Sequence, residues 1–149
     1  MRIAVLNGPN LNLLGLREPE IYGRSTLSQV ENGLAVIARE LDVSVECSQE
    51  NSEGSLIDIV HGFRGRIDGA VVNLGAYSHT SLALRDALVG VSVPFVEVHV
   101  SNVYAREQER HHSMLASAAV GVVIGLGVHG YELALRGLVA TLRARSAEA

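Results

Sequence analysis

The chain has no tryptophan, one cysteine and three prolines among its 149 residues. With Cys47 as the only thiol, no disulfide can form within the chain, and the absence of a nearby basic residue favours a small core residue over a reactive one. A net charge of -4 without a basic tract gives no support for nucleic-acid binding. No apolar run reaches the ~18 residues of a membrane span, and no secretory leader is recognisable. We therefore expect a reduced, cytoplasmic protein that contacts neither nucleic acid nor membrane.

Nearly half of the residues are apolar, which suits one well-packed domain over residues 1–149. Short β-branched runs alternate with longer segments of helical periodicity. This order predicts an α/β fold, a five-stranded parallel sheet with helices on both faces. The expected strands are 3–6, 43–47, 70–74, 93–100 and 119–124; the expected helices are 26–41, 56–63, 80–89 and 130–145; residues 146–149 are expected to fray.

A long irregular segment, about residues 8–24, follows the first strand. Loops of this length in compact domains are usually functional or disordered, and the leucines within this one argue against disorder. We therefore predict a functional segment, here called the lid segment for the role that a family resemblance given below implies.

Polar side chains follow three of the predicted strands. In parallel sheets, ligands bind beyond the carboxyl ends of the strands, near the point where strand order reverses. Asn73 ends one strand, with His79 soon after it, and another strand ends at Glu97-Val-His99. The first strand leads into the lid segment. The sequence therefore predicts one polar site at this edge of the sheet.

Two patterns suggest a cofactor or a metal, but each is incomplete. Residues 125–130 match G-x-G-x-x-G, yet neither a following strand nor a suitably spaced acidic residue completes a dinucleotide-binding unit, so we predict a tight turn. Glu97 and His99 share a strand face, but no third metal ligand accompanies them. We therefore predict neither cofactor nor metal. Ser78 and Ser81 are expected to cap a helix rather than to act as nucleophiles.

Tyr22 is a candidate general base within the lid segment. A free phenol has a pKa of about 10, so a base that works at neutral pH needs neighbouring cations that favour the phenolate. Arg17 lies in the same segment and Arg106 follows a strand, so both are candidate neighbours. The alternative is that Tyr22 is simply a packed aromatic residue.

His99 is the natural general acid, and Glu97 is placed to orient it and keep it protonated. The alternative is a buried histidine paired with a carboxylate for structural reasons. Asn73 suits hydroxyl recognition, and Arg110 can bind hydroxyl or carboxylate groups. Ser101 can offer a backbone N–H to a carboxylate.

His79 and Asp86, seven residues apart, are expected on one helix face, although a surface ion pair with Arg85 is an alternative for Asp86. A base, an acid, cations and hydroxyl-binding groups together suit proton abstraction next to a carbonyl and loss of a leaving group. The expected substrate is a small polyhydroxylated acid.

Several motifs resemble those of the type II 3-dehydroquinate dehydratases over most of the chain. They are NGPNLNLLG and REPEIYG in the lid segment, GAYSHTSLALRDAL, VEVHVSNVYARE, RHHS and the closing GYELAL. The resemblance implies a flavodoxin-like domain that assembles as a dodecamer of four trimers. It also implies dehydration of 3-dehydroquinate to 3-dehydroshikimate, in aromatic biosynthesis or quinate breakdown, without metal or cofactor.

The resemblance also implies a role for each matching residue. Tyr22 would remove the C2 proton to give an enolate, and His99 would protonate the leaving hydroxyl. Arg17 would stabilise the transition state as the lid closes, Asn10 would hold a water, and Arg106 would favour the tyrosine phenolate. The remaining residues would hold the substrate, with Asp86 reaching in from a neighbouring subunit: Asn73, His79, Asp86, Val100, Ser101 and Arg110.

The chain departs from the family pattern at a few positions. Leu74 stands where a proline is usual, which bears on how Asn73 is presented, and Glu109 replaces an aromatic residue beside Arg110. The segment Gln49–Gly54 also differs. No catalytic candidate is lost, so we expect an enzyme. The competing hypotheses are a non-catalytic flavodoxin-like module that binds a small ligand, and a paralogue kept only for assembly.

Overall fold

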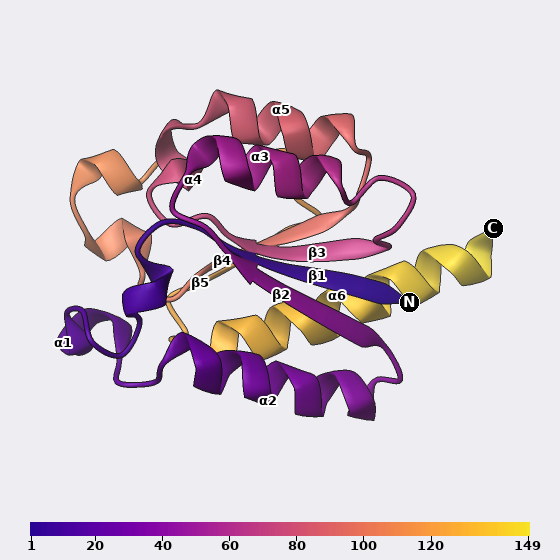
Figure 1. Ribbon diagram of the computed structural model, residues 1–149, viewed down its shortest axis with the longest axis horizontal. Helices are drawn as coiled ribbons and strands as arrows, with labels where there is room; N and C mark the ends of the chain where they lie inside the picture. Colours follow the sequence, from indigo (N-terminus) through magenta and orange to yellow (C-terminus); the bar gives the residue numbers. More distant parts are fainter.

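The computed structural model describes residues 1–149 and contains one five-stranded sheet, in the order β2-β1-β3-β4-β5, with all strands parallel (Figure 1). This confirms the predicted fold class, and the order is that of flavodoxin-like sheets. The strands are β1 Arg2–Asn7, β2 Ser44–Gln49, β3 Gly69–Asn73, β4 Phe95–His99 and β5 Gly121–Ile124. The helices are α1 Pro19–Tyr22, α2 Leu27–Glu40, α3 Glu53–His61, α4 Tyr77–Thr80, α5 Leu82–Gly90 and α6 His129–Glu148, with 3-10 turns at Leu11–Leu13, Val103–Ala105 and Gln108–Arg110.

Helices cover both faces of the sheet, with α3 and α5 on one face and α2 and α6 on the other (Figure 1). Each face has its own buried cluster, and alternate residues of the strands supply the two. Leu6 and Val72 point toward α3 and α5, whereas Val5 and Val71 point toward α2 and α6. Side chains of a strand alternate between the two faces of its sheet, so these near-continuous apolar strands fill both layers.

The helices differ from the expected ones around Ser81 and at the end of α6. The helix predicted over 80–89 corresponds to α5, and the short helix α4, which was not predicted, precedes it; Ser81 separates the two and caps α5 by accepting from Leu84 N–H. Ser78 was expected to cap as well, but its buried hydroxyl has no partner. Helix α6 extends past the expected end at residue 145 to Glu148. Thr26 and Gln29 form a capping box at the start of α2.

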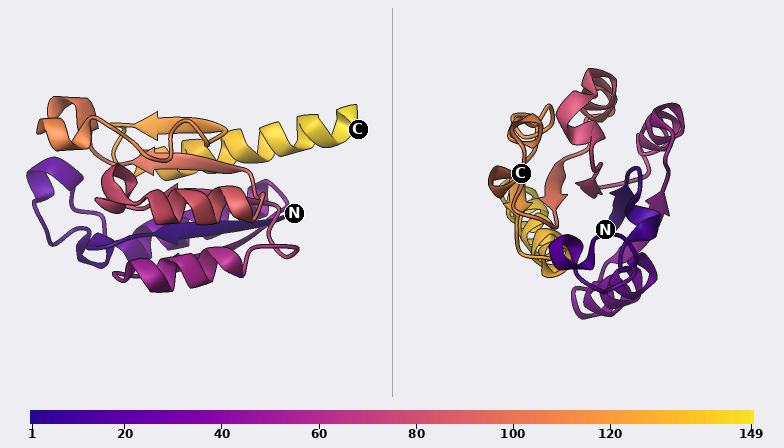
Figure 2. Two further views of the ribbon diagram at one scale, coloured as in Figure 1. Left: turned by 90° about the horizontal axis from the view of Figure 1, so that it is seen from above. Right: turned by 90° about the vertical axis from the view of Figure 1, so that its left-hand side faces the viewer.

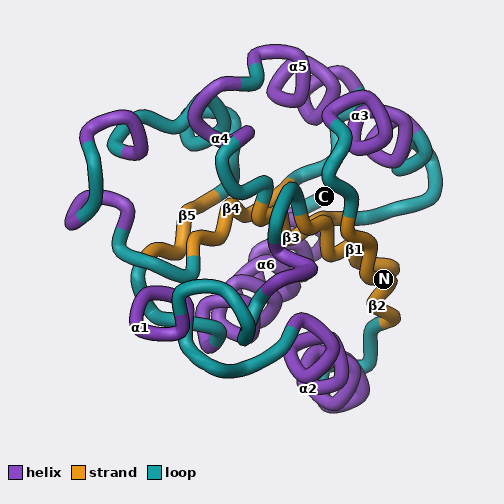
Figure 3. Tube along the Cα trace, turned by 60° about the vertical axis from the view of Figure 1, so that its left-hand side comes forward, coloured by secondary structure: helices purple, strands orange, loops and turns teal.

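The order of the strands reverses between β1 and β3, because β2 lies on one side of β1 while β4 and β5 follow β3. Asn7 and Asn73, the last residues of these two strands, are register partners. The segments that follow β1, β3 and β4 gather at this end of the sheet, and both chain termini lie at the opposite end (Figures 2 and 3). A ligand site is therefore expected here. None of the helices combines the length and apolar character needed to cross a membrane.

Cys47 packs at the edge of the cluster beneath α2, and burial raises the pKa of its thiol to about 12. We expect iodoacetamide to alkylate it at pH 8 at least about a hundredfold more slowly than the same chain unfolded in guanidinium, because the thiolate is the nucleophile. Mass spectrometry of timed samples measures both rates. Equal rates would contradict the inert, partly buried thiol.

Candidate active site

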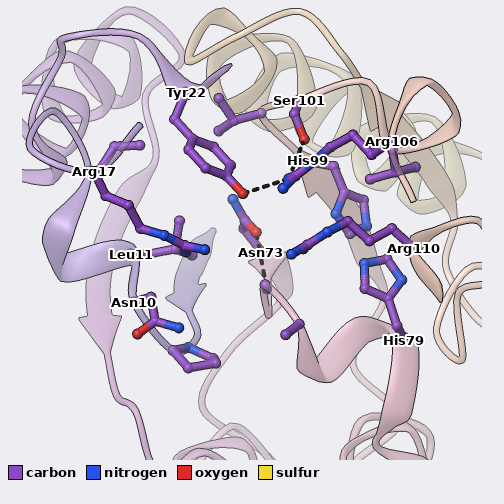
Figure 4. Close-up of a pocket in the computed structure, with 16 residues that line it drawn as sticks. Asn10, Leu11, Arg17, Tyr22, Asn73, His79, His99, Ser101, Arg106 and Arg110 are labelled. Carbon is purple, nitrogen blue, oxygen red and sulfur yellow. Dashed lines mark hydrogen bonds between the residues drawn. The ribbon is translucent and has the colours of Figure 1, made fainter. Parts of the chain in front are cut away.

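One cleft of about 670 Å³, including its open mouth, lies where the chain leaves β1, β3 and β4 (Figure 4). It brings together all but two of the predicted site residues. Those lining it are Asn10, Arg17, Tyr22, Asn73, His79, His99, Val100, Ser101, Arg106 and Arg110, and Pro9, Leu11, Leu14, Gly75, Ala76 and Val103 complete the lining. Glu97 lies directly behind His99, and Asp86 lies elsewhere on the molecule.

Tyr22 points its hydroxyl into the cleft between two arginines (Figure 4). Arg106 Nη1 donates a hydrogen bond of 2.5 Å to the phenol oxygen and a second, of 3.3 Å, to Ser101 Oγ. The Arg106 and Arg17 guanidinium carbons lie 5.2 and 5.4 Å from the centre of the tyrosine ring. The phenol oxygen therefore accepts a hydrogen bond from one guanidinium, while a second guanidinium faces the ring. This is the arrangement predicted from the sequence for a general base.

Glu97 and His99 form a buried pair at the end of β4. His99 Nε2 lies 2.6 Å from Glu97 Oε1, the glutamate is fully buried, and the imidazole side chain is 7% exposed. A buried carboxylate at this distance fixes the orientation of the ring. The other ring nitrogen, Nδ1, has no hydrogen-bond partner within the chain and remains available to a ligand.

His79 stands beside His99, with the ring centroids 5.6 Å apart and the rings stacked. Burial lowers the pKa of His79, and the nearby charges of His99 and Arg110 lower it further. Its Nδ1 lies 2.8 Å from the carbonyl oxygen of His112, which can only accept, so Nδ1 carries the proton. Nε2 of the neutral ring is therefore an acceptor for a ligand hydroxyl.

Glu107, which sequence reasoning did not select, organises the arginines at the mouth of the cleft. Its carboxylate accepts a hydrogen bond from Arg110 Nε and lies 3.7 Å from Arg106 Nε. The hydrogen bond from Arg110 is the main cause that lowers the pKa of Glu107 to about 2. The ion-pair partner of Arg110 is Glu107 and not Glu109, the departure from the family pattern. A possible signal was the i, i+3 spacing of Glu107 and Arg110.

The floor of the cleft contains a buried hydrogen-bonded chain that joins β3, α6 and β1. Asn73 Nδ2 donates to the Tyr131 hydroxyl at 2.8 Å, and that hydroxyl donates to Asn7 Oδ1 at 2.5 Å. Asn73 Oδ1 accepts from Gly75 N–H. Leu74, the departure from the proline pattern, is fully buried in the core, and Asn73 still lines the cleft beside it. The hydrogen bonds to Tyr131 and Gly75 thus fix the orientation of the Asn73 amide.

We expect Tyr131→Phe to lower the free energy of unfolding by about 1–3 kcal/mol at pH 7, because two buried amides lose their common partner.

Burial raises the pKa of the Tyr131 phenol. The folded chain therefore keeps this proton after the unfolded chain loses it near pH ~10, and stability falls as the pH rises further. The variant should show a shallower alkaline loss. Urea unfolding at neutral and alkaline pH measures both effects. Equal stability of variant and parent at pH 7 would contradict the role of the hydroxyl. The control is Tyr104→Phe, which changes an exposed tyrosine.

Gln49 and Asn51, which the sequence did not single out, hold the start of the lid segment. Gln49 Nε2, at the end of β2, donates to the Gly8 carbonyl and to Asn51 Oδ1, and that oxygen also accepts the backbone N–H of Asn10. Gly8 itself passes so close to Leu74 that a Cβ would lie 2.5 Å from its carbonyl oxygen. The register pairing of Asn7 with Gln49 brings this amide to Gly8, and the sequence alone does not reveal that register.

The prediction that Asp86 and His79 share one helix face is wrong. His79 lies in α4 and Asp86 in α5, and Ser81 separates the two helices. Asp86 lines a separate groove between α3 and α5, together with Ile57, His61 and Arg64. Within one chain, therefore, Asp86 takes no part in the cleft.

The glycine-rich segment 125–130 forms a turn rather than a nucleotide-binding loop. Gly125 and Gly127 have positive φ angles of 82° and 62°, and their N–H groups bond to the carbonyls of His99 and Val100. The segment thereby fixes the end of β4, where the site residues lie. No group of three or more histidine, cysteine or acidic side chains is arranged to hold a metal ion.

The whole chain is similar to proteins of one family. The model of the family "Dehydroquinase class II" matches residues 1–139. A relative from Gemmatimonas aurantiaca, named 3-dehydroquinate dehydratase, is 60% identical over 95% of this chain and 93% of its own. The solved type II dehydroquinases from Propionibacterium acnes and Butyrivibrio crossotus are 44% and 43% identical, with TM-scores of 0.89 and 0.90. Both alignments cover 93% of this chain, and 96% and 97% of the solved chains.

Proposed function

The chain belongs to the class II dehydroquinase family, and we propose that it dehydrates 3-dehydroquinate to 3-dehydroshikimate by an anti elimination through an enolate. The observation that carries this proposal is the pairing of two features in one cleft. Tyr22 lies between two guanidinium groups, and His99 is paired with a buried carboxylate. This is the inventory that the reaction needs: a base for a carbon acid and an acid for a leaving hydroxyl.

In the first step, the Tyr22 phenolate removes a proton from C2, next to the C3 carbonyl of the substrate. The electron pair moves onto the carbonyl oxygen and gives an enolate. Arg106 favours the phenolate by donating to its oxygen. Arg17 faces the same ring from the lid and stabilises the negative charge of the transition state. Asn10, whose backbone is held by Asn51, positions a water at the enolate oxygen.

In the second step, the enolate collapses to the conjugated ketone and expels the C1 hydroxyl. His99 donates its proton to that hydroxyl, which leaves as water, and the ring returns to its neutral form. Because Nε2 is bonded to Glu97, the donating nitrogen is Nδ1. Glu97 remains a carboxylate and stabilises the imidazolium before the transfer.

The other polar groups of the cleft hold the substrate. Asn73 and neutral His79 bind hydroxyl groups, and Arg110 binds a hydroxyl or carboxylate group. The segment Val100–Ser101 offers backbone N–H groups and the Ser101 hydroxyl to the carboxylate. Asp86 of a neighbouring subunit completes the site.

This last contribution requires assembly, and we propose a dodecamer of four trimers that works in the cytoplasm in the shikimate pathway. Two exposed apolar residues on α5 support it, since Leu82 and Val89 lie four residues before and three residues after Asp86 and therefore share its helix face. Sedimentation equilibrium tests this assembly against the 15.9 kDa chain mass. A monomer in dilute solution would contradict it.

Incubation with 3-dehydroquinate tests the reaction directly, because the conjugated product absorbs in the ultraviolet and the substrate does not. We expect turnover without added metal or cofactor, in the presence of a chelator. No absorbance change at high enzyme concentration would contradict the proposed function. Stabilisation by nucleotides or flavin, with none by cyclic polyhydroxy acids, would favour a binding module instead.

A further inference from the structure

Glu97 is the least solvated charged group of the molecule. It is 0% exposed and has two hydrogen-bond partners in the chain. One is His99, through Nε2; the other is Ser113, whose hydroxyl lies 2.7 and 2.9 Å from the two carboxylate oxygens. A buried carboxylate stays ionised only if its partners stabilise the charge. Stabilisation of the Glu97 charge therefore depends on Ser113 as well as on His99.

The direction of the hydrogen bond from Ser113 is fixed by its surroundings. The backbone N–H groups of Leu115 and Ala116 both lie 3.0 Å from Ser113 Oγ and donate to it. A hydroxyl oxygen has two lone pairs and one proton. With both lone pairs occupied, the proton is left for Glu97, and Ser113 acts as an obligatory donor. A donor aimed at a carboxylate favours the ionised form over the acid.

The charges around His99 show why the ionised form of Glu97 is needed. His79 is stacked on the ring, and Arg106 and Arg110 line the same cavity, as do Tyr22 and Arg17. The arginines oppose a positive charge on the imidazole. Glu97 is the carboxylate in hydrogen-bond contact with it. If Glu97 held the proton instead, His99 would be neutral and could not serve as an acid.

We propose that Ser113 is a positioning residue of the active site, whose hydroxyl keeps Glu97 ionised and thereby keeps the transferable proton on His99. The proposal rests on the proposed role of His99 as general acid. Without the hydroxyl, the proton moves from His99 to Glu97 inside the pair. The total number of protons on the pair is unchanged, but the acid is no longer on the side that faces the substrate.

The test compares Ser113→Ala with Ser113→Thr, which retains a hydroxyl. The control is Ser78→Ala, which removes a buried hydroxyl that has no partner and does not line the cleft. Histidine labelled with ¹⁵N reports the protonation of each ring, and the His99 signals are assigned by their loss in His99→Asn. At pH 7 we expect an imidazolium signal for His99 in the parent, in Ser78→Ala and in Ser113→Thr, and a shift toward the neutral ring in Ser113→Ala. Infrared difference spectra should show a new carboxylic acid band in that variant, absent after Glu97→Gln.

Kinetics provide the second readout. We expect kcat of Ser113→Ala to fall about tenfold while KM stays within about twofold, since one hydrogen bond to a charged group changes and no substrate contact is lost. The basic limb of the kcat profile should not move to lower pH, because losing the donor also disfavours the fully deprotonated pair. A purely structural defect would raise KM as well.

The outcomes separate this proposal from the proposed function. A parent protein without turnover contradicts the proposed function, and the nuclear magnetic resonance comparison still decides the role of Ser113. A His99 signal that is neutral in the parent, or unchanged in Ser113→Ala, overturns the present proposal. If Ser113→Ala does not fold, Ser113→Cys, with its weaker donor, should give a smaller shift in the same direction; no shift in that variant overturns the proposal equally.

Discussion

Replacement of Tyr22 by phenylalanine should lower kcat by roughly 10²–10⁴-fold, the range that a positioned general base contributes. The change removes one oxygen and keeps the ring that Arg17 and Arg106 face at 5.4 and 5.2 Å. The cleft should therefore keep its shape. Substrate affinity, measured by isothermal titration calorimetry on the inactive variant, should change little.

Tyr104→Phe is the matched control for this substitution. Tyr104 lies two residues before Arg106 in the chain, but the residue is 63% exposed and does not line the cleft. Its loss of a hydroxyl should leave kcat unchanged. Hydrogen exchange at C2 of the substrate in deuterated water gives a second measure, since a missing base stops exchange as well as dehydration. An unaltered rate of either process in Tyr22→Phe would exclude Tyr22 as the base.

The fold and the position of the site could be predicted from the sequence because local patterns carry that information. Apolar runs predicted the five strands, and helical periodicity predicted the helices between them. The rule that ligands bind beyond the carboxyl ends of parallel strands then located the site. Tyr22 was conspicuous as an aromatic residue among polar ones in a long irregular segment. Glu97 and His99 were linked by the two-residue period of a strand.

The supporting contacts could not be predicted, because they join residues far apart in the chain. Ser113 reaches Glu97 across 16 positions, and Tyr131 reaches Asn7 across 124. No periodicity relates such pairs. The helix break at Ser81 was missed for a different reason: a capping serine is compatible with either the start of a helix or a break within one.

Replacement of His99 by asparagine should also reduce dehydration by roughly 10²–10⁴-fold, but it should leave the first step intact. In the proposed mechanism Tyr22 removes the C2 proton, and the hydrogen bond of Tyr22 to Arg106 does not involve His99. The enolate should still form and return, so exchange of the C2 hydrogen with deuterated water should continue in His99→Asn.

Stability must be measured alongside, because the substitution leaves Glu97 buried without its charged partner. Breaking such a pair costs about 3–5 kcal/mol, so urea unfolding should show a large loss, and rates are to be compared only below the unfolding transition. The double variant Glu97→Gln with His99→Asn removes the uncompensated charge and should recover part of that stability without recovering dehydration. Loss of exchange in a folded His99→Asn protein would mean that the imidazole acts before the enolate forms. Retained exchange with absent dehydration would show that His99 acts when the hydroxyl leaves. Loss of its side chain would then block the second step without blocking removal of the C2 proton.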